Sequence, residues 1–494
     1  MMLFSLILLP LTFMTLSLLI KKSGIKKRLA ILMAGLNFFL TLVLVPIVHF
    51  KEIIVVNMGS WPAPYGISLV ADRFSVFMLV VSAVIFFITI IYSKQAVDKP
   101  RRKNGFYFFS FGILMGVNGS FVAGDIFNLY VWFEVMLMSS FILISLGGER
   151  AQLEGAIKYL ILNLISSFFF VAGIGLLYGK LGTLNLADLS YKMSQIKDLS
   201  LISPALILIF VGFSIKGALF PFFYWLPASY HTPPPAVSAL FAGLLTKVGI
   251  YAIIRLYTLL LYHNQPFWSV LLFWIGGLSM VIGVIAASSQ YDFRKILSFH
   301  IISQMGYVII ALAFNTVAGL SAAIFFLGHN MLAKTNAFLV AGWVYKSRGT
   351  LDLKSLGDVF RQSRIWGFLF FISAFSLAGL PPLSGFAAKY LVLKAGIEAH
   401  HIGISLVALF VGLFTLFSMV KIWMEVFWKP TPSDNMMPLP PMKQKDKWMV
   451  VSSVMLALAI IGMGIWAKPI VDYCQLAAAD LLNPSKYIYH VLGL

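Results

Sequence analysis

Long apolar runs separated by short polar breaks recur along the whole chain. As a helix, a run of about twenty apolar residues crosses a hydrocarbon core of roughly 30 Å, and we count about fourteen such runs. The predicted spans are residues 2–20, 29–49, 72–93, 105–123, 125–146, 155–179, 201–226, 234–261, 267–289, 295–314, 318–345, 362–397, 402–428 and 447–467. The pattern predicts an all-α polytopic membrane protein.

The composition agrees with this prediction and limits the function. Hydrophobic residues fill 60% of the 494 positions and charged residues only 11%, whereas a soluble domain carries roughly a quarter charged residues. The net charge of +19 resides in short basic clusters between the apolar runs. Such clusters set topology and contact anionic headgroups, so membrane lipids are expected partners and nucleic acid is not.

No sequence pattern for a cofactor or a metal is present. A single cysteine, Cys474, leaves no cysteine-based metal or iron–sulfur site, and no glycine-rich phosphate loop is found. No pair of histidines inside the spans has haem or metal spacing. We therefore expect a secondary ion transporter subunit without cofactor, metal or ATP hydrolysis, and not an enzyme.

The basic clusters fall in alternate loops. They begin after the first span and end with the loop that holds Lys443, Lys445 and Lys447. By the positive-inside rule these loops face the cytoplasm. With an even number of spans, both termini then lie outside, which we expect to be outside a bacterial plasma membrane.

Prolines interrupt two of the predicted spans. The seventh contains Pro221 and Pro227, and the twelfth contains Pro381 and Pro382. Proline removes a backbone donor and clashes with the preceding turn, so each span should be a broken helix. The two spans are expected to cross the membrane in opposite directions. Broken helices in matching positions of opposed halves are typical of inverted repeats around a transport route.

The predicted spans divide the chain into four parts. The expected domains are N-terminal transmembrane helices (1–104), a first five-helix repeat (105–261), a second, inverted five-helix repeat (262–428), and a cytoplasmic loop with the last transmembrane helix and C-terminal tail (429–494).

A few charged residues fall deep inside spans, where each costs about 2.5–3.5 kcal/mol and usually has a function or a partner. Glu134 lies in the fifth span and Lys216 in the seventh, just before its break. A carboxylate beside a buried lysine favours the charged amine, so a Glu–Lys pair of changing separation can load and release a proton. The alternative for Glu134 is a permanent structural ion pair.

Lys247 in the eighth span and Lys389 in the twelfth repeat this pattern of one charge in an apolar run. Lys389 follows the proline break, where exposed backbone gives access to water. Lys394 is nearer the helix end and is expected to extend its ammonium to the interface. His231 belongs to a loop at the cytoplasmic mouth of the broken seventh span, where it is a candidate for proton entry.

The eleventh span is unusually polar, with His329 and Lys334 close together. A histidine titrates near neutral pH, so the two could carry a proton between the broken helices. The alternative is a polar patch that joins helices by hydrogen bonds.

Several charged residues lie near the predicted ends of spans. Capping, topology and lipid contact are expected to explain most of Asp72, Asp125, Arg255, Lys421 and Glu425. Lys421 and Glu425 are four residues apart and are expected to pair with each other.

Three segments resemble the antiporter-like subunit superfamily. Residues 124–134, Gly-Asp-Ile-Phe-Asn-Leu-Tyr-Val-Trp-Phe-Glu, resemble its fifth helix. Residues 216–240, with His-Thr-Pro-Pro-Pro at 231–235, and Leu-Pro-Pro-Leu-Ser-Gly-Phe at 380–386 are similar to its two broken helices. The superfamily includes proton-pumping subunits of respiratory complex I, membrane-bound hydrogenases and Mrp-type cation/proton antiporters. Within it, the chain most resembles the D subunits of Mrp-type Na⁺/H⁺ antiporters.

This resemblance implies specific roles for the buried charges. Glu134 and Lys216 would form the coupled pair, Lys247 and Lys334 would relay protons centrally, and Lys389 would lead to the far exit. The family usually places a histidine four residues before the eleventh-helix lysine. Asn330 occupies that position here, with His329 adjacent, which leaves the role of the histidine open.

The sequence therefore predicts a proton-translocating subunit of a multisubunit Na⁺/H⁺ antiporter. Its expected partners are other hydrophobic subunits, H⁺ and Na⁺. Two alternatives remain open from the residues alone. One is a proton-pumping subunit of a complex I-like dehydrogenase or membrane-bound hydrogenase, and the other is a non-conducting scaffold subunit.

Overall fold

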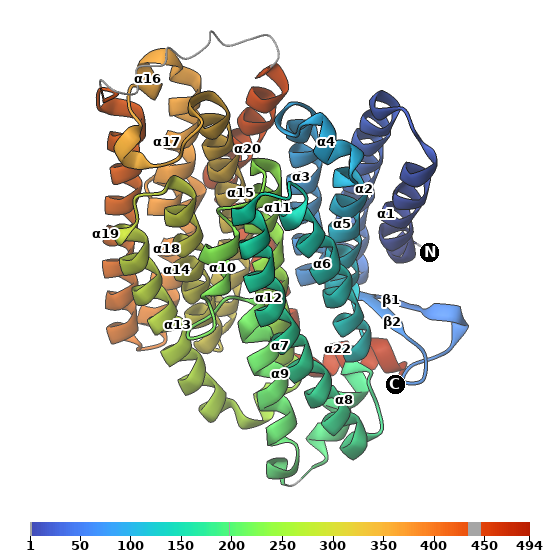
Figure 1. The fold of residues 1–494 in the computed structure, drawn as a ribbon. Helices are drawn as coiled ribbons and strands as arrows, with labels where there is room; N and C mark the ends of the chain where they lie inside the picture. Colours follow the sequence, from blue (N-terminus) through green and yellow to red (C-terminus); the bar gives the residue numbers. More distant parts are fainter. Residues whose placement is uncertain (1, 197, 433–445) are drawn as a thin grey trace.

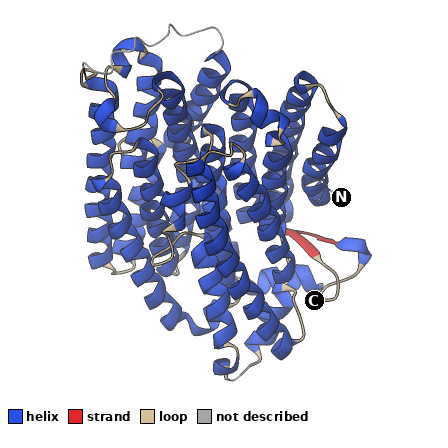
Figure 2. Ribbon diagram, viewed as in Figure 1, coloured by secondary structure: helices blue, strands red, loops and turns tan. Residues whose placement is uncertain are grey.

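Figure 1 shows a bundle of long helices, most of them running along a common axis. This computed structural model describes residues 2–196, 198–432 and 446–494. Figure 2 shows that, in this described part of the chain, one small hairpin accounts for the strands, β1 (Ile54–Asn57) paired antiparallel with β2 (Ser68–Ala71). The predicted all-α membrane fold is confirmed, with this hairpin as an addition.

The α-helices follow one another with short connections. Those of the first half are α1 (Met2–Leu19), α2 (Ser23–Lys51), α3 (Arg73–Ala96), α4 (Lys99–Lys103), α5 (Phe106–Val122), α6 (Ile126–Ser145), α7 (Arg150–Leu181), α8 (Leu186–Ser194), α9 (Ser203–Lys216), α10 (Trp225–Ser229), α11 (Pro235–Leu240) and α12 (Thr246–Leu259). Those of the second half are α13 (Gln265–Ser289), α14 (Phe293–Ala313), α15 (Val317–Arg348), α16 (Val359–Gln362), α17 (Arg364–Ala378), α18 (Ser384–Glu398), α19 (Ile402–Ile422), α20 (Lys447–Ile465), α21 (Ala467–Leu481) and α22 (Pro484–Leu492).

Six short helical turns complete the set within the described residues. Four are 3₁₀ turns, η1 (Met58–Ser60), η2 (Leu199–Leu201), η4 (Leu261–Asn264) and η5 (Leu353–Ser355). The π-helical turns are η3 (Phe241–Leu245), between α11 and α12, and η6 (Trp423–Trp428), after α19.

The predicted spans are found as helices. Within the described residues, 11 helices are long and apolar enough to cross a membrane, and α5, α9 and α17 are shorter apolar helices. They lie where the apolar runs predict them, so the multi-pass architecture is confirmed. The exact number of crossings stays a prediction.

Helix α15 lies at the centre of the bundle. It packs against α3, α11, α14, α17, α18, α20 and α21. Helices α12 and α14 are likewise almost wholly enclosed, whereas α2, α7, α13 and α19 expose apolar side chains on one side. Polar side chains on α12, α14 and α15 are therefore held away from the apolar exterior.

Both predicted breaks are present. Helix α9 ends at Lys216 and the chain resumes helical structure at Trp225, whose Nε1 donates to the Ile215 carbonyl at 2.8 Å. Helix α17 ends at Ala378, where Gly379 has φ 93°, and α18 begins at Ser384. In Figure 1, α9 begins near the lower end of the bundle and α17 near the upper end, so the two broken spans run in opposite directions.

The C-terminal tail predicted after the last span contains two helices, α21 and α22. Helix α21 packs against α3 and α15, and α22 packs against α8. Buried Cys474, Ala477 and Ala478 form the inner face of α21. The opposite face is polar, so this helix has no long apolar run. The basic loop with Lys443 and Lys445 lies outside the described residues.

The predicted pair between Lys421 and Glu425 is wrong. Glu425 pairs with Lys429 at 2.5 Å. The Lys421 ammonium instead donates to the Ser288 and Gln290 carbonyls, at 3.0 and 2.9 Å. The carbonyls at a helix end have no partner inside the helix, so the end of α13 offers stronger acceptors than a neighbour on the same helix.

Candidate functional site

Glu134 and Lys216 are joined through a third residue. The hydroxyl of Ser167, on α7, donates to Glu134 Oε1, and the Lys216 ammonium donates to Ser167 Oγ at 3.2 Å. Lys216 also lies over the Phe133 ring, 5.2 Å from its centroid. The serine has one proton and one oxygen, so it connects the ammonium to the carboxylate in a fixed order. A proton can pass along this line without direct contact between the two charges.

Ser167 is not among the residues selected from the sequence. It lies on the inner face of α7 together with Tyr159, Asn163 and Ser166, all buried. Their spacing of four, three and one residues is that of one helical face. Polar residues repeating at this period in an apolar span are the signal that could have found it.

Lys247 lies at the start of α12, fully buried. Its ammonium donates to the Ala242 carbonyl, five residues earlier, in the π-helical turn η3. A π-helical turn disturbs the regular hydrogen-bond ladder and is frequent at functional sites. The turn thus supplies Lys247 with a neutral acceptor.

Two close approaches place Lys247 between Lys216 and Lys334. A Cβ at Gly249 would lie 2.7 Å from the Gly217 nitrogen and 2.9 Å from the Lys216 carbonyl carbon, so α12 crosses the end of α9 at that point. A Cβ at Gly243 would overlap the Thr335 hydroxyl, so η3 touches α15 beside Lys334. Only glycine permits such contact.

Lys334 and His329 lie on α15, and both are fully buried. The Lys334 ammonium donates to the Leu297 carbonyl of α14 at 3.1 Å. His329 Nδ1 lies 2.9 Å from Ser384 Oγ and 3.5 Å from Ser376 Oγ. These serines stand on either side of the second break, so His329 contacts both halves of the broken span.

Lys389 lies on α18, just past the break. Its ammonium donates to the carbonyl of Ala378, the last residue of α17, at 2.9 Å. A helix C-terminus carries partial negative charge and unpaired carbonyls, so the break provides the acceptor for this lysine. Lys389 also lies 5.5 Å from the centroid of the Tyr307 ring.

The four buried lysines share one electrostatic feature. Among the described residues, neither Lys216, Lys247, Lys334 nor Lys389 forms a direct ion pair with a carboxylate. A neutral oxygen accepts from each of them instead. Lys394, by contrast, is half-exposed and pairs with Glu398 at 3.7 Å. Burial without a counter-charge disfavours the charged form of an amine, so such a lysine gives up its proton more readily than an exposed one, as a relay requires.

Polar groups with open hydrogen-bonding capacity lie on the enclosed helices α12, α14 and α15. In the described part of the chain, buried atoms without a protein partner include the Asn330 amide, the Gln304 amide, His329 Nε2 and the Thr246 hydroxyl. Buried polar groups are normally satisfied, often by internal water. The interior of α12, α14 and α15 is therefore suited to a hydrated path.

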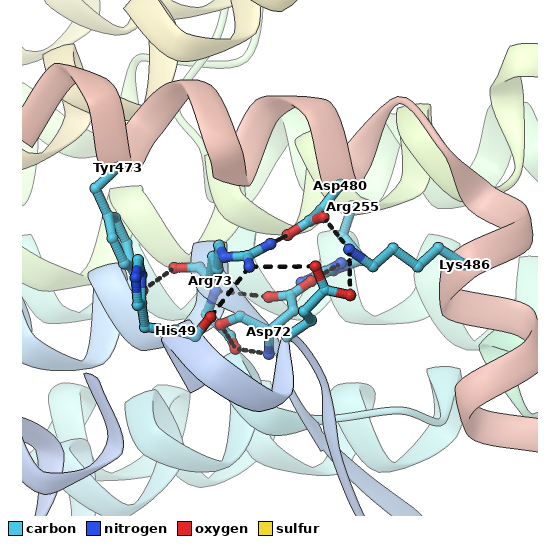
Figure 3. Close-up of polar contacts among 9 residues, drawn as sticks. His49, Asp72, Arg73, Arg255, Tyr473, Asp480 and Lys486 are labelled. Carbon is cyan, nitrogen blue, oxygen red and sulfur yellow. Dashed lines mark hydrogen bonds and ion pairs between the residues drawn. The ribbon is translucent and has the colours of Figure 1, made fainter. Parts of the chain in front are cut away.

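A second cluster of charges lies near the C-terminus and is shown in Figure 3. Arg255, buried on α12, pairs with Asp72 at 2.6 Å, and Asp72 also caps α3. For Asp72 and Arg255 the sequence predicts a role in capping, topology or lipid contact. Capping is confirmed for Asp72, and the buried ion pair is additional.

The C-terminal helices complete this cluster. Asp480 of α21 contacts Arg73, and Lys486 of α22 bridges Asp480 and Glu52 at 2.6 and 2.8 Å. Tyr473 donates to the Arg73 carbonyl at 3.2 Å. These contacts fasten α21 and α22 to α3 and the end of α2 (Figure 3).

A cavity of about 310 Å³ lies near the first break, lined by Glu154, Lys158, His231 and Lys295 among others. His231 Nδ1 lies 2.8 Å from the Pro227 carbonyl. Burial, reinforced by Lys295, lowers the pKa of His231. His231 thus lies near the first break, and the cytoplasmic location of this cavity stays a prediction.

Several known membrane proteins resemble this chain in sequence. Residues 123–415 match the family model described as NADH:quinone oxidoreductase/Mrp antiporter, TM. The D subunit of the Na⁺/H⁺ antiporter of Alkalihalophilus pseudofirmus is 42% identical, with 90% of each chain aligned. The protein of the same name from Bacillus subtilis is 39% identical over 91% of this chain and 90% of that one.

A solved structure, the Mrp complex from Dietzia sp. DQ12-45-1b, contains a chain with TM-score 0.92 and 28% identity. The alignment covers 100% of this chain and 99% of that one. The matched residues 123–415 contain every buried charge of the candidate site. The chain belongs to the NADH:quinone oxidoreductase/Mrp antiporter transmembrane family.

Proposed function

We propose that this chain is the proton-translocating subunit of a multisubunit Na⁺/H⁺ antiporter, and that protons move along Glu134, Lys216, Lys247, Lys334 and Lys389. The observation that carries the proposal is the series of buried lysines, each held by a neutral oxygen, with one carboxylate at its start. The relatives named as D subunits of Na⁺/H⁺ antiporters support the choice of ions.

The proposed path begins at the first break. The cavity beside His231 supplies protons, and Glu134 sets the charge of Lys216 through Ser167. Lys247 and Lys334 pass the proton between the repeats, and Lys389, assisted by His329, delivers it beyond the second break. Ion gradients drive the flow, without ATP hydrolysis or a redox centre in this chain.

The proposed setting is a bacterial plasma membrane with both termini outside. The domains are the four expected from the sequence, with 105–261 and 262–428 as inverted repeats. Other hydrophobic subunits of the complex contact the apolar outer faces, where lipids fill the remaining surface. The chain in the Mrp complex, which aligns over this whole chain, supports assembly of this kind.

The test is Na⁺-dependent proton movement in everted vesicles that lack the native antiporters. The complete complex is compared with complexes carrying Glu134→Ala or Lys216→Ala, at equal amounts of assembled complex. Loss of exchange in both variants is expected. Exchange that survives both substitutions would place the route in a partner and leave this chain as a scaffold.

A further inference from the structure

Helix α14 carries a polar stripe between two of the proposed relay lysines. Positions 297, 300, 304 and 307 are spaced three or four residues apart, so they lie on one face of the helix. Lys334 donates to the carbonyl of Leu297, and Lys389 lies over the ring of Tyr307. The two residues of α14 that these lysines contact are ten positions apart, or about 15 Å along the axis at 1.5 Å per residue.

His300 lies on this face between the two contacts. Its side chain is buried, with Nε2 2.5 Å from the hydroxyl of Ser418 on α19. The Ser418 hydroxyl has main-chain acceptors of its own, the Phe414 and Thr415 carbonyls at 3.0 and 3.2 Å. Since the serine proton is directed to these carbonyls, Ser418 accepts from the imidazole, and the proton of the neutral ring is on Nε2. Nδ1 is then a bare acceptor.

Two buried polar groups on this face of α14 have unused hydrogen-bonding capacity. His300 Nδ1 has no protein partner among the described residues, and neither atom of the Gln304 amide, one turn away and fully buried, has one. His300 is three residues from Leu297, whose carbonyl accepts from Lys334, whereas His329 contacts Ser376 and Ser384 at the second break, where Lys389 donates to Ala378. His300 thus stands on the Lys334 side and His329 on the Lys389 side.

We propose that His300 is a proton-relay residue between Lys334 and Lys389, acting before His329 in the direction of the second break. This inference rests on the proposed function. The Lys334 ammonium gives one proton to Nδ1 of the neutral ring and becomes an amine. The imidazolium passes one proton, through water bound by Gln304, toward the neutral amine of Lys389. The ring returns to its first tautomer, and one proton has moved.

The experiment compares His300→Gln with the unaltered complex in everted vesicles, by Na⁺-dependent proton movement at equal assembly. Glutamine can still donate to Ser418 but cannot be protonated. Exchange is expected to fall at least about tenfold, since general acid–base groups contribute about 10²–10⁴ in rate where they act. His490→Gln, on the exposed face of α22, is the matched control and should exchange normally.

A double variant separates relay from packing. Gln304→His in the His300→Gln background returns an imidazole to the same stripe, one turn along, and should restore part of the lost exchange. Wild-type exchange in His300→Gln, or a loss that Gln304→His does not recover, would overturn the inference. If Glu134→Ala and Lys216→Ala also exchange normally, the proposed function fails as well; if those two are inactive, only the role of His300 falls.

Discussion

The Lys216 ammonium lies 3.2 Å from the hydroxyl oxygen of Ser167, and that hydroxyl donates to Glu134. Three helices, α6, α7 and α9, each contribute one member of this line. The acid and the base of the proposed switch are thus separated by a residue that can conduct a proton but carries no charge. The separation allows either charge to change without breaking a direct ion pair.

Removing the Ser167 hydroxyl should uncouple Glu134 from Lys216. A hydrogen bond to a charged group contributes about 1.5–3 kcal/mol, so Ser167→Ala is expected to lower Na⁺-dependent proton exchange about tenfold or more. Ser167→Thr keeps the hydroxyl and should retain most activity. Ser194→Ala, at an exposed position of α8, serves as the control. Full exchange in Ser167→Ala would show that Glu134 and Lys216 communicate directly.

The contact between Lys389 and the broken end of α17 predicts a contrast with its neighbour Lys394. Lys389→Gln removes the buried ammonium that donates to the Ala378 carbonyl, and should abolish exchange. Lys394→Gln removes only a half-exposed pair with Glu398, and such pairs contribute about 0–1 kcal/mol. Na⁺-dependent proton exchange by the Lys394→Gln complex should therefore match that of the unaltered complex. Equal losses in the two variants would contradict the assignment of Lys389.

The crossing of α12 over the end of α9 predicts a strict need for glycine at position 249. A Cβ there would lie 2.7 Å from the Gly217 nitrogen, so Gly249→Ala must force the helices apart. Overpacking of this kind costs about 1–3 kcal/mol and should lower the unfolding midpoint of the purified complex. Gly175→Ala, on α7 with open space around it, should leave the midpoint unchanged or raise it.

The buried pair of Arg255 and Asp72 predicts a double-mutant cycle. Arg255→Met leaves a buried carboxylate without its partner, which costs about 3–5 kcal/mol. Asp72→Asn keeps the capping oxygen for α3 but leaves Arg255 unpaired. The double variant removes both charges and should recover most of the lost thermal stability. Additive losses in the cycle would show that the two side chains do not interact.

The attachment of the C-terminal helices should depend on pH. The hydrogen bond from Lys486 lowers the pKa of Glu52, with Arg73 adding to the effect. Because the folded pKa lies below the unfolded value of about 4.3, this contribution is complete above that pH and is lost as the pH falls through the folded pKa. Hydrogen exchange of α21 and α22 should rise over that acidic range.

Glu52→Gln provides the comparison for this prediction. The variant cannot change charge, so its α21 and α22 should exchange faster than those of the unaltered chain near neutral pH, and the difference should vanish in acid. The carboxylate is 42% exposed, which limits the effect to a modest one. Identical exchange at neutral pH would mean that Asp480 alone holds Lys486.

Local features of the sequence are sufficient to predict the membrane architecture, the two breaks and the identity of the buried charges. An apolar run of sufficient length forms a transmembrane helix, and a proline inside it breaks that helix. A lone lysine far from the ends of such a run is buried away from water. Glu134, Lys216, Lys247, Lys334 and Lys389 could therefore be selected from their surroundings in the chain.

The contacts of those charges depend on how the helices pack. Ser167 is 49 residues from Lys216, Asp72 is 183 from Arg255, and Ser418 is 118 from His300. Polar groups in an apolar interior must find partners on neighbouring helices, and which helices are neighbours follows from packing, not from order in the chain. The sequence alone does not predict the amphipathic helix α21 or its ion pairs for the same reason. Both are stabilised by surfaces that form only when the helices of the bundle have packed.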